Sequence, residues 1–181
     1  MRALGPGSVS SFLKIALDVV YVLIWIIAVV VAVCGIATLL FQPFAASHLH
    51  FNYEIAGRER SFDLLRQGPM LALVMLAVEA YLAALIVIFN RLRRVFETLT
   101  LGDPFRPENV SRLRVIGLAL VALEVLGYLV RLSAAWLLPR DAVDVSVSLN
   151  FSGWFAIMVV FVLAEVFREG ARLRGEAELT I

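Results

Sequence analysis

Three charged side chains stand well inside long apolar stretches, away from the ends of those stretches, where charged residues are rare. Glu79 lies in the second of four such stretches, and Glu124 and Arg131 lie in the third. Charged groups at bilayer depth are costly to bury, and they commonly mark an ion pathway, a proton relay or a ligand site. We therefore take these three residues, together with Tyr128, as a candidate intramembrane polar cluster.

Helical spacing indicates how the members of this cluster can meet. Glu124, Tyr128 and Arg131 are related by i, i+4 and i+7, which places them on one face of a helix. An ion pair between Arg131 and Glu79 would lower the cost of burying both charges. Glu124 would then be protonated, or hydrogen bonded to Tyr128 or Tyr81. Such a cluster can simply fix the register of the helices; a proton or ion pathway and a ligand site are the alternatives.

The four apolar stretches have the length that a bilayer requires. A helix rises about 1.5 Å per residue, so about 20 apolar residues cross a hydrocarbon core about 30 Å thick. Hydrophobic residues make up 61% of the 181-residue chain, and the mean hydropathy is +0.90, well above the values of soluble domains. The sequence predicts an all-α membrane protein with one domain, residues 1–181. Its expected helices are about 17–41, 69–100, 108–138 and 149–175, the last three extending into the cytoplasm.

Basic residues are divided unequally among the segments that connect these helices. Eleven lie in the N-terminal segment, the middle loop and the C-terminal tail: Arg2, Lys14, Arg91, Arg93, Arg94, Arg106, Arg112, Arg114, Arg168, Arg172 and Arg174. The other two loops hold four: Arg58, Arg60, Arg66 and Arg140. Short loops rich in Lys and Arg stay in the cytoplasm. We expect a multi-pass membrane protein with both termini cytoplasmic.

The two outer loops contain segments with the alternation of strands. The pattern is imperfect over residues 48–55 and clean over residues 143–149. Two short strands in these loops can pair into a small β cap. The first apolar stretch is longer than the core of a signal peptide, so we expect it to be retained as an anchor rather than cleaved near residues 42–47.

Signatures of catalysis are not apparent in the chain. It shows no Gly-rich phosphate loop, no supported Ser-His-Asp arrangement, and one cysteine, Cys34, inside the first apolar stretch. We therefore expect no enzyme activity, no catalytic residues, no cofactor and no metal. A net charge of +1 gives no reason to expect direct binding of nucleic acid.

The middle loop, residues 101–117, and the tail, residues 164–181, carry a recognisable pattern. They resemble an uncharacterised bacterial family of four-helix membrane proteins with a G-[DE]-P-F-x-x-E-N loop and an L-x-x-E-x-[ED]-L-T-[IV] end, and the resemblance covers essentially the whole chain. In the loop the pattern includes Gly102, Asp103, Pro104, Phe105, Glu108 and Asn109. In the tail it includes Glu176, Glu178, Leu179, Thr180 and Ile181.

The resemblance implies a partner more than an activity, because the family has no established activity. Its members are commonly encoded beside a small helix-turn-helix regulator, which implies a membrane component acting with a cytoplasmic transcription factor. Because the family is bacterial, the resemblance also implies the cytoplasmic (inner) membrane. We expect a non-enzymatic binding or regulatory protein whose loop and tail contact this partner, and a homo-oligomer is compatible with the sequence.

Several alternatives remain open at this stage. The loop can merely shape a turn with Phe105 at the membrane interface, or its arginines can meet anionic lipid headgroups. The alternative function is a small transporter or ligand sensor that uses the intramembrane cluster.

Overall fold

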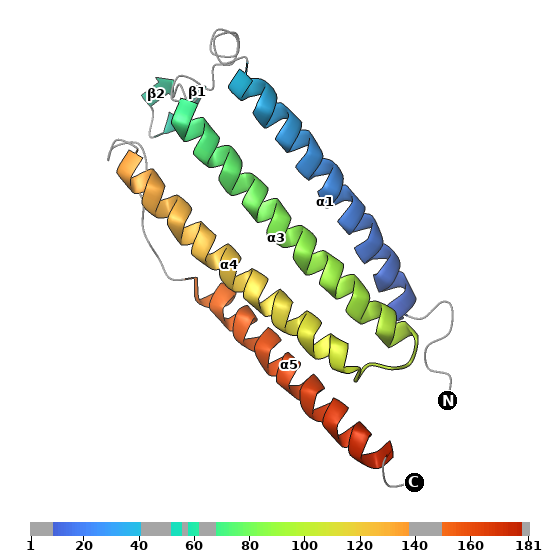
Figure 1. The fold of residues 1–181 in the computed structure, drawn as a ribbon. Coiled ribbons are helices and arrows are strands. Elements are labelled where there is room, and N and C mark those ends of the chain that lie inside the picture. The colour runs from blue at the N-terminus through green and yellow to red at the C-terminus, as the bar shows by residue number, and fades with distance from the viewer. Residues whose placement is uncertain (1–8, 41–51, 56–57, 62–67, 138–149, 179–181) are drawn as a thin grey trace.

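The computed structural model describes residues 9–40, 52–55, 58–61, 68–137 and 150–178, and the structural statements below refer to these residues (Figure 1). Its elements are, in chain order, α1 (Val9–Leu40), β1 (Asn52–Ile55), β2 (Arg58–Ser61), α3 (Gly68–Thr100), α4 (Pro107–Leu137) and α5 (Phe151–Glu178). All four described helices have the length and composition to cross a membrane. The prediction of an all-α, multi-pass membrane protein is therefore confirmed.

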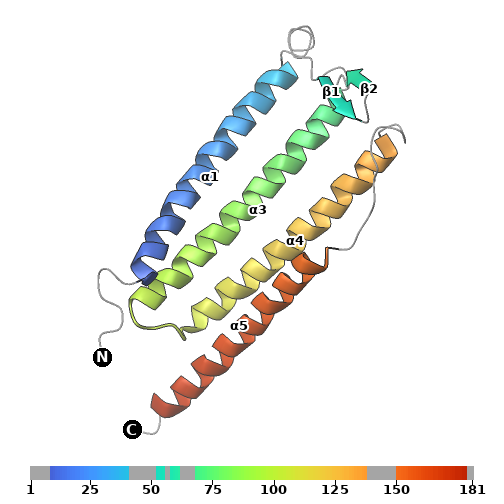
Figure 2. The ribbon, with the colours of Figure 1, turned by 180° about the vertical axis from the view of Figure 1, so that it is seen from behind.

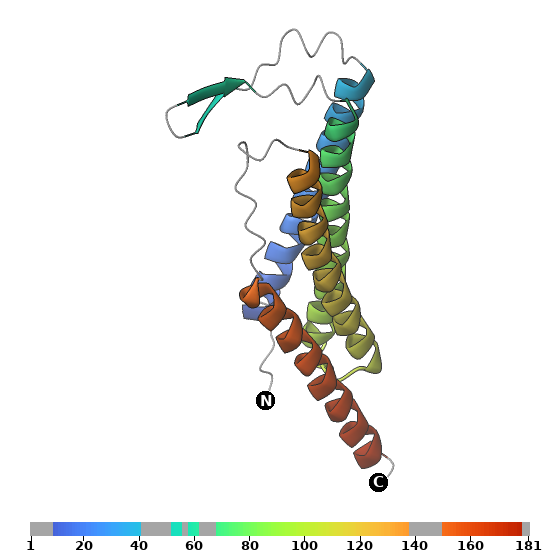
Figure 3. The same cartoon turned by 90° about the vertical axis from the view of Figure 1, so that its left-hand side faces the viewer.

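The helices lie side by side in one row, in the order in which they occur along the chain (Figures 1 and 2). Extensive contacts join α1 to α3, α3 to α4, and α4 to α5. Seen along the row, the helices form a single layer rather than a closed bundle (Figure 3). Large apolar side chains are consequently left uncovered by protein: Phe12, Trp136 and Phe151 are 74%, 84% and 78% exposed. Lipid is the environment that such faces require.

Small apolar clusters hold neighbouring helices together. Ile24 and Ala28 of α1 pack against Leu82 of α3, and Leu113 and Ile116 of α4 pack against Ala164 of α5. These contacts fix which face each helix turns toward its neighbour.

An ion pair reinforces the contact between α1 and α3. Asp18 pairs with Arg93, whose guanidinium carbon also lies 4.5 Å from the centre of the Tyr21 ring. α1 begins at Val9, about two turns before the expected start near residue 17. Leu17, near that expected start, is buried, and Asp18 has a partner in α3.

The last helix, α5, is displaced along α4. Its first turn lies against Glu124, about halfway along α4, while its other end passes the first residues of α4 (Figures 1 and 2). Asn150 caps this helix: its carbonyl accepts from the Trp154 N–H at 3.1 Å, and its side-chain oxygen accepts from the Gly153 N–H at 3.3 Å. We call the end of the row that holds residues 101–106 and the end of α5 the junction end. We call the opposite end, which holds β1 and β2, the hairpin end.

The observed strands differ from the expected pairing. β1 pairs antiparallel with β2, in the register Asn52↔Ser61 to Ile55↔Arg58. Both strands come from the connection between α1 and α3, and the expected strand at residues 143–149 lies outside the described residues. A two-residue connection makes the local pair favourable, because closing a short loop costs little chain entropy.

The arrangement predicts opposite accessibility at the two ends. In a Cys34→Ala background, single cysteines at Ser61, in β2, and at Leu173, 54% exposed in α5, test the sidedness. The bias of basic residues predicts that the junction end is cytoplasmic, so in intact cells a membrane-impermeant thiol reagent should label the Ser61 site and spare the Leu173 site. Permeabilised cells should label both, and labelling of Leu173→Cys in intact cells would mean that the topology is inverted.

Candidate functional site

The loop between α3 and α4 begins with a well-defined helix cap. The Gly102 N–H donates to the Leu99 carbonyl, and the Asp103 N–H donates to the Thr98 carbonyl, both at 3.1 Å. These two hydrogen bonds form a Schellman motif. The motif requires a residue with positive φ, here Gly102 with a φ of 79°. Pro107 then begins α4, at a position where its missing N–H leaves no helical bond unmade.

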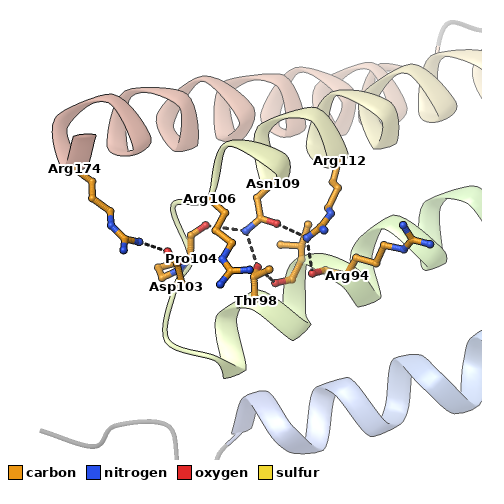
Figure 4. A network of polar contacts seen from close by, with 9 residues as sticks. Arg94, Thr98, Asp103, Pro104, Arg106, Asn109, Arg112 and Arg174 are labelled. Carbon is orange, nitrogen blue, oxygen red and sulfur yellow. Dashed lines mark hydrogen bonds and ion pairs between the residues drawn. The ribbon is translucent and has the colours of Figure 1, made fainter. Parts of the chain in front are cut away.

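The side chain of Asn109 is fully buried and ties three segments together (Figure 4). Its Nδ2 donates to Thr98 Oγ1 at 2.6 Å and to the Pro104 carbonyl at 2.9 Å. Its Oδ1 accepts from Arg112 Nη1 at 2.8 Å, and the same nitrogen donates to the Arg94 carbonyl at 2.9 Å. We call Thr98, Pro104, Asn109 and Arg112 the loop junction. It fixes the end of α3, the loop and the start of α4 in one geometry.

Asp103 connects the loop to α5 (Figure 4). Its carboxylate accepts from Arg106 Nε at 2.7 Å and pairs with Arg174 of α5. The hydrogen bond from Arg106 is the main reason that the pKa of Asp103 lies below its ordinary value; partial desolvation opposes this shift and Arg174 adds to it. A lowered pKa keeps the carboxylate charged at neutral pH, so the connection weakens only as the pH falls through that lowered value.

Phe105 packs on α5 at a glycine. Its ring centre lies 5.6 Å from that of Phe167, and a Cβ placed on Gly170 would come within 2.5 Å of the Phe105 ring. Small residues let elements approach closely at such interfaces. Phe105 is 38% exposed, so its ring contacts α5 while the residue stays partly accessible.

The end of α5 carries mixed charges toward solvent. Ion pairs join Glu165 to Arg168 and Glu169 to Arg172, and Arg172 also lies 3.7 Å from Glu176. Glu108 is exposed in the first turn of α4, and the side chain of Glu178 and the predicted tail residues Leu179, Thr180 and Ile181 lie outside the described part. The described loop and tail residues thus lie at one end of the molecule.

A second polar network joins the middle of α4 to the start of α5. Glu124 Oε1 accepts from Asn150 Nδ2 at 2.8 Å. The Tyr128 hydroxyl accepts from the Asn150 N–H at 3.3 Å and from Trp154 Nε1 at 3.2 Å. The carboxylate lies at the N-terminal end of α5, where the helix dipole favours negative charge. A side chain at Gly153 would overlap Glu124, which shows how closely the two helices approach.

The structure does not bring Glu79 and Arg131 together, although an ion pair was expected. Glu79 lies one turn from Met75 and Leu82, which contact α1, and its Oε1 is buried without a hydrogen-bond partner among the described residues. Arg131 instead lies over the Tyr128 ring, 5.9 Å from its centre. A difference of one position turns a side chain by about 100° around a helix, so matching depth does not ensure contact.

Several residues of these two networks were not predicted from the sequence. Asn150 is one of them, although a sequence signal could have identified it: it directly precedes an apolar stretch, as N-cap residues usually do. Thr98, Trp154 and Gly170 carry no such signal, because their roles depend on the register of neighbouring helices. No group of three or more metal-binding side chains occurs among the described residues.

The fold and these networks define a small membrane protein built as an open row of four helices. The chain belongs to the DUF2975 family of proteins of unknown function, whose model matches residues 46–181. This agrees with the resemblance to an uncharacterised family, but α1 lies before the matched region, whereas the resemblance was expected to cover the whole chain. No curated protein and no solved structure matches the chain significantly.

The loop junction predicts a large effect of one substitution. Asn109→Ala should lower the free energy of unfolding by about 2–3 kcal/mol, because Thr98 and the Pro104 carbonyl lose a buried partner. Ser111→Ala, at an exposed position of the same helix, is the matched control and should change it by less than about 0.5 kcal/mol. Unfolding in detergent measures both, and equal stabilities of the two variants would contradict the role of Asn109.

The positions of the intramembrane charges predict two different coupling energies. A double-mutant cycle of Glu79→Leu with Arg131→Leu should give less than about 0.5 kcal/mol, because these side chains do not meet. A cycle of Glu124→Leu with Asn150→Leu should give about 1 kcal/mol or more, because they are hydrogen bonded. A strong coupling in the first cycle would show that Glu79 and Arg131 do form the ion pair expected from the sequence.

Proposed function

We propose that this protein is a non-enzymatic regulatory or binding component of a bacterial cytoplasmic membrane, and that it acts with a small helix-turn-helix transcription regulator. The regulator would bind the junction end from the cytoplasm. The gene neighbourhood implied by the family resemblance supports this partner, and the bias of basic residues supports this side of the membrane.

The observation that carries the proposal is the contact between the loop and α5. The ion pair of Asp103 with Arg174 and the packing of Phe105 on Gly170 join the loop to the charged end of α5. Both segments belong to the family pattern, and these contacts join them into one continuous surface. The Phe105 ring packs on α5, and the solvent-facing side of α5 remains to contact the partner.

The exposed side of α5 has the character of a binding surface. Charged residues of both signs surround Leu173, an apolar side chain that is 54% exposed. An apolar anchor with a charged rim is typical of protein interfaces, since the rim steers association and the anchor supplies affinity. Lipid headgroups alone would use the arginines but not Leu173.

A small transporter or ligand sensor is the second candidate. The network of Glu124, Tyr128, Asn150 and Trp154 favours it, because polar side chains midway along apolar helices are commonly functional. Glu79 and Arg131 support this candidate less than expected, since they do not join that network.

A pull-down of the neighbouring regulator from cross-linked membranes tests the proposal. Leu173→Asp and deletion of residues 176–181 should each reduce recovery of the regulator, the former by about tenfold, as expected when an interface loses an apolar anchor. Gly175→Ala is the matched control, because a Cβ there meets nothing within 4 Å.

The abundance of the membrane protein separates lost binding from lost folding. It should equal that of the unchanged chain in all three variants, because Leu173, Gly175 and Glu176 are exposed near the end of α5. Undiminished recovery with both Leu173→Asp and the deletion would rule out this surface as the binding site.

A further inference from the structure

A groove opens between α3 and α4 toward the hairpin end of the row. Its volume is about 390 Å³, within the range of small-molecule sites. Apolar side chains form most of its walls, and Gly127 leaves room in the α4 wall. Two groups give it polarity: Tyr81 of α3 and Arg131 of α4.

Arg131 is a charge that the described protein does not neutralise. Its side chain is exposed, and its contact among the described residues is the face of the Tyr128 ring. Arginine remains ionised under all ordinary conditions, so within an apolar setting it requires an anion. The groove is therefore apolar along its length and carries a fixed positive charge at one end.

We propose that this groove binds a long-chain fatty acid, with the chain along the apolar walls and the carboxylate paired with Arg131. The guanidinium suits a carboxylate because its planar fork can donate two parallel hydrogen bonds. Residues Leu123 to Arg131 span eight helical steps, about 12 Å, which provides a wall for one chain.

A single groove favours a fatty acid over a phospholipid. Arg131 lies near the edge of the candidate membrane span of α4, Pro107–Ser133. A phospholipid carries two acyl chains, and its phosphate lies in the headgroup region, outside the hydrocarbon core. A fatty acid has one chain with the carboxylate attached directly to it, which matches one apolar groove with Arg131 at its end.

Binding of radiolabelled oleate to the purified full chain in amphipol tests the proposal. Arg131→Gln should raise the dissociation constant about tenfold or more, because a charge-assisted hydrogen bond is lost. Arg131→Lys keeps the charge and should lose much less. Gly127→Leu should abolish binding by filling the groove, and Gly175→Leu, at another open glycine outside it, should bind normally.

Competition identifies the occupant. Unlabelled oleate should displace the label, while oleyl alcohol and phosphatidylglycerol should displace it at least about tenfold less well, since one lacks the charge and the other carries it in a headgroup. Equal binding by the Arg131→Gln variant would overturn the carboxylate site. Equal displacement by phosphatidylglycerol would overturn the choice of a fatty acid. Neither result depends on the proposed regulator, whose binding surface is at the opposite end of the row.

Discussion

The buried carboxamide of Asn109 is the interaction on which the helix row depends. An amide without access to water must find partners for its N–H groups and its oxygen, and here they come from α3, the loop and Arg112. A shift of α4 along α3 by one residue would break them together. The amide therefore fixes the register of these two helices, which apolar packing against lipid leaves weakly specified.

The register of α5 is fixed at two separate places. At the junction end, Asp103 and Phe105 hold it through Arg174 and Gly170. Midway along α4, Glu124 holds it through Asn150. Between them, Gly117 approaches the Phe161 ring so closely that a Cβ there would come within 2.9 Å of it. Helices that gain little from excluding water are positioned by such specific contacts.

The sequence was sufficient for the parts of the fold that depend on composition along the chain. The four helices follow from the length of the apolar stretches, and the turn at residues 101–106 follows from its glycine and prolines. The displacement of α5 does not follow, because it depends on which residues of α4 and α5 meet. Neither does the separation of Glu79 from Arg131, which depends on the rotation of α3 about its axis.

The candidate site was predictable to the same extent. The loop residues were identified by their pattern, yet Asn109 and Phe105 were expected to face a partner, and they contact the protein's own helices. Glu124 and Tyr128 were placed correctly on one face of α4, whereas their partner Asn150 lies in another helix. A single sequence contains the residues that make such contacts, but it does not indicate which of them pair.

The order of the helices in the row has a consequence for how the chain is made. Each helix makes its extensive contacts with the helix that precedes it and the one that follows it in the described chain. As a ribosome delivers them one at a time, every new helix finds its packing surface already in the membrane. Contacts between successive helices keep the contact order low, which favours rapid assembly. An early helix does not depend on a partner that is synthesised much later.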